Sequence, residues 1–169
     1  MPKGLKQTSS LIQISGDVRE SAANTFTDEK VDLQLNALDN EVFVVQSIDL
    51  SLPMPDNLTD TQSDVELTLS STQRTSVGSL SNTNVMAFLR TSIQNVGDTC
   101  AVFQETKGGE TPPASMDYVY IIATPDFYAN IVGNNNANGK VGSYRVYGYR
   151  AKADAATYAA LVQSEVLSE

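Results

Sequence analysis

The chain has 169 residues and a formal net charge of −9, from 11 Lys+Arg against 20 Asp+Glu. It contains no His, no Trp and one Cys, which excludes His-based general-base catalysis, thiolate zinc sites and a disulfide within the chain. The pI near 4.4 argues against a protein that binds nucleic acid over its whole surface, because phosphate neutralisation requires clustered Lys and Arg.

Apolar and polar residues alternate with a period of two along most of the chain, a pattern typical of half-buried β-strands. The clearest examples are Ile48, Leu50 and Leu52 within the stretch Val42–Leu52 (VFVVQSIDLSL), and Val65, Leu67 and Leu69 within Asp64–Ser70 (DVELTLS). The predicted strands cover residues 11–14, 31–35, 42–52, 64–70, 85–93, 99–104, 118–123, 127–132 and 141–150.

Residues that favour turns separate these segments. Pro53 and Pro55 end the strand before them, because proline cannot donate to a ladder. The Asn/Gly-rich run Asn134–Gly139 favours positive φ, and Asn138-Gly139 is predicted to close a hairpin. Many short strands with regular turn signals predict an all-β antiparallel sandwich, specifically a single jelly roll of about eight strands with a short C-terminal α-helix. The Cys…Trp…Cys spacing of immunoglobulin domains is absent.

One α-helix is predicted, at the end of the sequence, with Asp154 as its N-cap. Its apolar stripe consists of Tyr158, Leu161, Val162 and Val166. Glu165 and Glu169 lie at the C-terminal end, where the helix dipole disfavours carboxylates, so fraying is expected after Ser164. So short a helix is not stable alone in water. It must therefore dock on the sheet or on a neighbouring subunit.

The sequence offers no convincing catalytic or cofactor site. Asp56, Asp60 and Asp64 are four residues apart and supply oxygen ligands suited to calcium, but the D-x-D-x-D-G loop pattern is missing. Solvated loop charges are the favoured interpretation. We therefore predict no catalytic residues, no cofactor and no metal, and a protein that is not an enzyme.

Aromatic and basic residues alternate near the C-terminus, where Tyr144, Tyr147 and Tyr149 are interleaved with Arg145 and Arg150. Such a strand can stack bases and bind phosphates. The alternative, favoured at this net charge, is cross-strand packing of the tyrosine rings. No strong direct binding of nucleic acid is expected.

The segment Asp117–Tyr128 (DYVYIIATPDFY), followed by an Asn/Gly loop, resembles the last strands of viral single jelly-roll capsid proteins. The strand Ser143–Arg150 (SYRVYGYR) and the closing Ala-rich helix extend the likeness. The resemblance implies an N-terminal arm or additional strands in residues 1–40, a jelly roll in 41–152 and a helix in 153–169. It implies a capsid subunit of the virion that self-assembles into an icosahedral shell.

Capsid proteins that package single-stranded RNA often carry a strongly basic N-terminal arm, whereas this chain offers only Lys3 and Lys6. The resemblance therefore implies a shell lined by an internal membrane, or a separate nucleic-acid-binding virion protein. No apolar run follows these lysines, so a signal peptide is not expected. We therefore expect synthesis in the host cytoplasm.

The predicted assembly contacts between copies are Leu11, Ile14, Tyr158, Leu161 and Val162. The alternative hypothesis is a non-catalytic binding module, such as a viral fibre or spike domain or a surface adhesin. Such a module would recognise its target through the loops 70–84 and 134–139.

Overall fold

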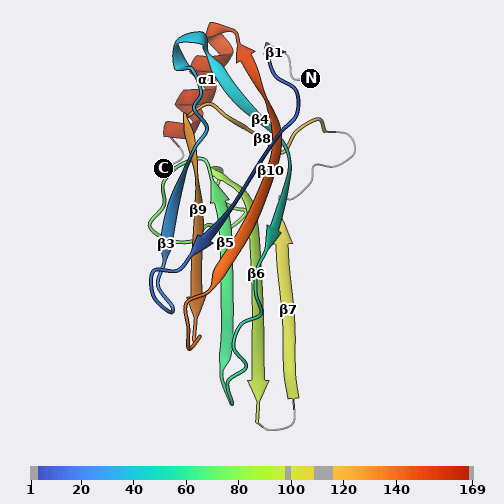
Figure 1. The fold of residues 1–169 in the computed structure, drawn as a ribbon, viewed down its shortest axis with the longest axis vertical. Coiled ribbons are helices and arrows are strands. Elements are labelled where there is room, and N and C mark those ends of the chain that lie inside the picture. Colours follow the sequence, from blue (N-terminus) through green and yellow to red (C-terminus); the bar gives the residue numbers. More distant parts are fainter. Residues whose placement is uncertain (1–3, 98–99, 109–115, 168–169) are drawn as a thin grey trace.

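The computed structural model describes residues 4–97, 100–108 and 116–167, which form two antiparallel β-sheets and one α-helix (Figure 1). One sheet, here called the β10 sheet, contains β1 (Leu5–Gln7), β2 (Ile12–Arg19), β4 (Glu41–Ser51), β8 (Tyr120–Ile122) and β10 (Val141–Ala153). The other, the β9 sheet, contains β3 (Thr27–Asp32), β5 (Gln62–Ser70), β6 (Val85–Val96), β7 (Cys100–Gly108) and β9 (Asp126–Asn134). A 3-10 turn, Ala37–Asp39, precedes β4, and α1 covers Ala155–Val166.

The strand pairing confirms the predicted jelly roll. β2 pairs with β10, β3 with β9, β4 with β8, and β5 with β6, all antiparallel. These nested pairs form one long hairpin that wraps around itself, so that successive pairs fall in alternate sheets until β5 and β6 close it. β1 extends the β2 edge along β10, and β7 is an additional strand outside β6.

The strands within residues 5–32 take part in both sheets. β2 pairs with β10 from Val141 to Gly148, and β3 pairs with β9 over its whole length. The sequence contained a signal for β2 and β3 but none for β1, which is only three residues long.

The hairpin predicted at Asn138-Gly139 is wrong, because β9 and β10 belong to different sheets. The carboxylate of Glu20, at the end of β2, lies between the two strand ends. It accepts hydrogen bonds from the backbone N–H of Gly133 at 2.6 Å and of Lys140 at 2.7 Å. The chain from 135 to 140 therefore crosses between the layers and forms no two-strand ladder.

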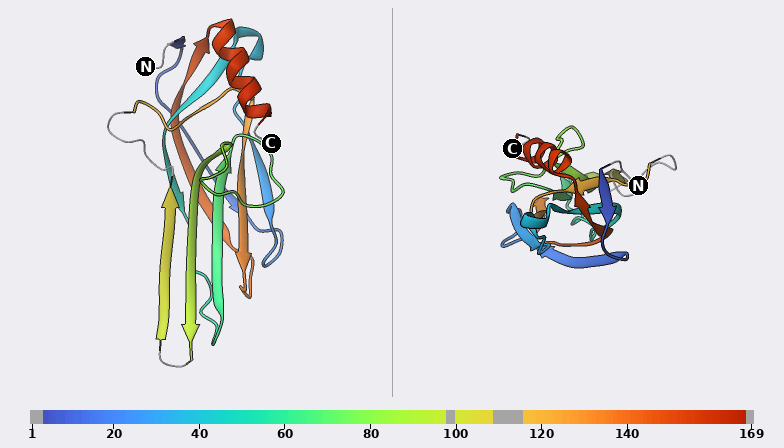
Figure 2. Two further views of the ribbon diagram at one scale, coloured as in Figure 1. Left: turned by 180° about the vertical axis from the view of Figure 1, so that it is seen from behind. Right: turned by 90° about the horizontal axis from the view of Figure 1, so that it is seen from above.

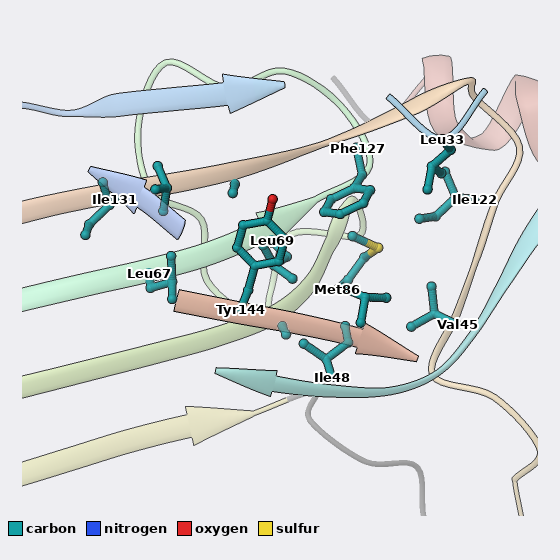
Figure 3. Packing of buried hydrophobic residues seen from close by; sticks show 14 of the residues in the cluster. Leu33, Val45, Ile48, Leu67, Leu69, Met86, Ile122, Phe127, Ile131 and Tyr144 are labelled. Atoms are coloured by element: carbon teal, nitrogen blue, oxygen red, sulfur yellow. The ribbon is translucent and has the colours of Figure 1, made fainter. Parts of the chain in front are cut away.

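The main core lies between the two sheets (Figure 3). Phe127 of β9 and Tyr144 of β10 meet edge to face there, with ring centroids 6.0 Å apart and an interplanar angle of 81°. Leu67 and Leu69 of β5 are fully buried against them. Edge-to-face contact of this kind adds to the energy of apolar burial.

A bulge in β4 follows a run of four apolar residues, Val42–Val45. Tyr147 pairs with Ser47 but Gly148 pairs with Val45, which leaves Gln46 as the extra residue. The inward face consequently changes from Ile48 on one side of the bulge to Val45 on the other. Val42–Val45 are buried on both faces of the strand, because α1 covers the outer side.

Glycine is required at position 148, opposite this bulge. A Cβ there would lie 2.4 Å from the backbone oxygen of Val44 and 2.6 Å from the ring of Phe43. The close approach of β10 to β4 therefore excludes a side chain at 148.

Among the residues described, no helix is long and apolar enough to cross a membrane.

Candidate assembly surfaces

The β7 edge is the least protected part of the described chain. β7 pairs with β6 from Phe88 to Val96 without a register shift, and no described strand pairs with its other side. Every residue from 101 to 107 is exposed, so both faces of the strand meet solvent. Figure 1 shows β6 and β7 projecting past the end of the β10 sheet.

The exposed tip of this projection carries apolar side chains. Val96 of β6 is 57% exposed, and Val102 and Phe103 of β7 are 54% and 50% exposed. The facing sheet cannot cover them, because its edge strand β8 has three residues and pairs with β4 at the opposite end. Exposed apolar groups beside a free strand edge are typical of a surface that contacts another chain.

Helix α1 packs on the outer face of the β10 sheet (Figure 2). Asp154 is its N-cap, as predicted, and accepts a hydrogen bond from the backbone N–H of Thr157 at 2.8 Å. The three predicted contact residues of the helix, Tyr158, Leu161 and Val162, are partly buried against Val44 and Tyr149 of the sheet. The helix thus docks on its own sheet. Contacts of these residues with another copy stay a prediction.

The helix ends at Val166, two residues beyond Ser164, and Glu165 is buried where fraying was expected to begin. Glu169 lies outside the described residues. The carboxylate of Glu165 accepts hydrogen bonds from the backbone N–H of Ala123 at 3.2 Å and of Thr124 at 3.0 Å. These N–H groups lie between β8 and β9, so the side chain joins the helix to the corner of the sandwich. A local dipole argument misses such a partner, which only the tertiary structure provides.

Burial raises the pKa of the Glu165 carboxyl, and the hydrogen bonds from Ala123 and Thr124 act in the opposite direction. In the sequence, the burial of Glu165 is indicated only by its position four residues after Leu161, on the apolar side of the helix.

The two predicted contact residues near the N-terminus point in different directions. Leu11 is 61% exposed, whereas Ile14 is partly buried against the main core. Ile14 pairs with Val146 of β10, which is fully buried. Leu11 is therefore available on the surface, and Ile14 contributes mainly to the fold.

The three aspartates weighed as calcium ligands have separate partners. Asp56 forms an ion pair with Lys140 at 2.6 Å, and Asp64 forms one with Arg90 at 3.2 Å. Asp60 accepts a hydrogen bond from the backbone N–H of Gly97 at 2.6 Å. Lys140 lowers the pKa of Asp56, and the N–H of Ala137 adds to this effect. Within the described ranges, no group of three or more His, Cys, Asp or Glu side chains is placed to hold a metal ion.

The loop 134–139, considered above for recognition, is fastened to the fold. Asn136 is 4% exposed, and its side-chain amide donates to the backbone oxygen of Asp64 at 2.9 Å. Its side-chain oxygen accepts from the N–H of Asp56, and its backbone exchanges two hydrogen bonds with the side chain of Asn24. A loop held in this way has little freedom to adapt to a ligand.

The other loop considered for recognition is buried at both ends and exposed in its middle. Ser71, Thr72 and Asn84 are buried, and Asn84 donates to the hydroxyl of Thr72 at 2.5 Å. Residues 79–83 are exposed. Gln73, Thr75 and Ser76 are exposed as well, so a partner can reach the loop at these positions.

The tyrosines of β10 do not share one face. Tyr144 points into the core, whereas Tyr149 lies on the outer side beneath α1, because the two positions differ in parity along the strand. Tyr147 accepts a hydrogen bond from the guanidinium of Arg145 at 3.3 Å on the outer face. The three rings consequently form no continuous stacking platform.

A shallow depression of about 390 Å³ lies on the outer face of the β10 sheet. It is lined by polar side chains from three neighbouring strands, namely Ser15 and Asp17 of β2, Asp49 and Ser51 of β4, and Ser143 and Arg145 of β10. Register places Arg145 between Ser15 and Asp49.

Comparison with known proteins does not place this chain in a family. No family model and no curated protein sequence matches it. One solved structure aligned with it is a tailspike protein of Acinetobacter baumannii bacteriophage Fri1, a capsular polysaccharide depolymerase. That alignment has 11% identity and a TM-score of 0.18, and covers 80% of this chain but 20% of the tailspike. The chain thus spans about a fifth of that protein, and at this TM-score the likeness supports no argument about fold or function.

Proposed function

We propose that this chain is a structural virion protein, a capsid subunit that self-assembles into an icosahedral shell. The observation that carries the proposal is a jelly roll with one nine-residue edge strand, β7, exposed on both faces and extending past the facing sheet. Natural proteins usually shorten, bend or cover such an edge. An edge left open in this way is suited to contact with a neighbouring subunit.

The remaining surfaces support the same proposal. Leu11 is exposed near the N-terminus, and Val166 and Leu167 are 57% and 76% exposed at the end of α1. These exposed apolar side chains are available for contact with neighbouring copies. We infer a role in contact between proteins and no enzymatic activity.

The negative charge bears on how such a shell would hold its genome. A net charge of −9 gives the subunit few cations with which to neutralise phosphates. We infer that other virion proteins or an internal membrane lie between the shell and the nucleic acid.

Size-exclusion chromatography with light scattering, followed by negative-stain imaging of the purified chain, tests the proposal. Shells or large rings are the expected result. A stable monomer or trimer that binds a glycan would overturn it, and would favour a binding module such as a spike or adhesin domain. The double substitution Ser81→Ala/Thr83→Ala in the exposed loop is the matched control, since it should abolish glycan binding in a module and leave shells unchanged.

A further inference from the structure

The four lateral edges of the two sheets are protected to different degrees. β8 is three residues long, β3 carries Asp28, Glu29 and Lys30, and β2 ends in charged residues while its inner face covers the core. β7 has nine residues, contains no proline and keeps regular pairing with β6 throughout. The N–H and C=O groups on its outer side alternate along the strand. A second β-strand can form hydrogen bonds with all of them, so this edge is suited to strand pairing.

The charges on β7 indicate which strand fits best. Glu105 and Lys107 lie on the same face, since they are two residues apart, and form an ion pair at 3.8 Å. In an antiparallel pair of two β7 strands centred on Thr106, each Glu105 is directly opposite the second copy's Lys107. Opposite charges at directly facing positions stabilise such a pair. A pair centred on Glu105 would instead place two carboxylates opposite each other.

We propose that β7 pairs antiparallel with β7 of a second copy across a two-fold axis centred on Thr106, which joins two β9 sheets into one continuous sheet. The contact is isologous, so one self-complementary strand supplies both sides. It adds a strand to an exposed sheet edge, a common mode of recognition. The inference rests on the proposed function in that it names one contact of the shell.

Charge reversal at positions 105 and 107 distinguishes the β7–β7 contact between copies from a loss of stability within a single chain. Glu105→Lys and Lys107→Glu each place like charges opposite each other in both symmetry-related pairs. We expect each to raise the dimer dissociation constant by about tenfold. An equimolar mixture of the two variants should restore dimers, because every lysine of one then faces a glutamate of the other. Analytical ultracentrifugation measures this, and failure of the mixture to associate more tightly than either variant alone would overturn the pairing.

Cross-linking tests the register. In a Cys100→Ser background, Thr106→Cys places two thiols directly opposite each other, at a Cα separation of about 4.5–5.5 Å that a disulfide spans. Under mild oxidation we expect a covalent dimer to form about tenfold faster than with the control Glu29→Cys, which lies exposed on the β3 edge of the same sheet. Equal rates would overturn the proposal.

The same samples distinguish this inference from the shell hypothesis. Shells in micrographs without preferential cross-linking at position 106 would overturn the β7 pairing and leave the proposed function standing. Dimers cross-linked at position 106, with no larger particle at any concentration, would support the pairing and overturn the shell.

Discussion

The helix end of the sandwich and the β7 edge each contain a run of four consecutive apolar residues, Val42–Val45 and Cys100–Phe103, but the two regions are buried very differently. At the helix end, Val42 and Val44 on the outer face of β4 are fully buried beneath α1. At the other extreme, Val102 and Phe103 of β7 are about half exposed on opposite faces. A strand's own pattern therefore does not decide its burial, because burial depends on which element lies opposite.

The largest expected contrast is between two phenylalanines. Phe127→Ala removes a fully buried ring between the sheets and should lower the free energy of unfolding by about 3–5 kcal/mol. Phe103→Ala, at the β7 edge, should cost less than about 1 kcal/mol in the monomer. Urea denaturation of dilute protein measures both, and equal losses would contradict the comparison.

At the helix end, Glu165→Ala should lower the free energy of unfolding by about 1–3 kcal/mol, because the N–H groups of Ala123 and Thr124 lose their buried acceptor. Glu165→Gln retains one acceptor oxygen and is the matched control, with a smaller loss expected. If the alanine variant were as stable as the wild type, the carboxylate would not be what holds the helix to the corner.

The same side chain predicts a pH dependence. Burial raises the pKa of Glu165 in the folded state, so the folded protein binds a proton at this carboxyl more tightly than the unfolded chain does. The stability gained from this protonation is fully present below the unfolded-state pKa and is lost as pH rises through the folded-state pKa. On acidification from about pH 7 to about pH 5, the wild type should therefore gain stability relative to Glu165→Gln. Urea denaturation of both proteins across this range gives the difference, which should be flat if the carboxyl titrates normally.

The smallest effect is expected from an exposed ion pair at the same end. Lys152 lies 3.2 Å from Asp39, and both side chains are more than half exposed. Lys152→Ala should change the free energy of unfolding by less than about 0.5 kcal/mol. A loss as large as that of Glu165→Ala would show that charge, and not burial, distinguishes the helix end from the β7 edge.

Strand positions were largely predictable because a period of two survives wherever one face is buried. β4, β5, β9 and β10 lie where their alternation indicated. β1 was not predictable, since three residues show no period. The hairpin at Asn138-Gly139 was wrong because the turn-forming preference of Asn-Gly is local, whereas Glu20 and the wrapping of the chain decide where the next strand goes.

The candidate surfaces were less predictable than the strands. Sequence indicated the apolar stripe of α1 but not its docking on the chain's own sheet, nor the burial of Glu165. A strand was predicted over residues 99–104, of which residue 99 lies outside the described part of the chain, whereas β7 continues to Gly108. The sequence alone does not reveal this extension, nor that the facing sheet ends before reaching β7.

The antiparallel sandwich, the terminal helix with its Asp154 cap and the absence of histidine chemistry all follow from the sequence, because periodicity, capping and residue types are local properties. Only the tertiary structure decided that residues 5–32 belong to both sheets, that Glu20 and Glu165 are buried acceptors, and that β7 is left bare. Those features depend on which segments meet across the fold. Such encounters are set by the packing of the whole chain and leave no trace in any short stretch of it.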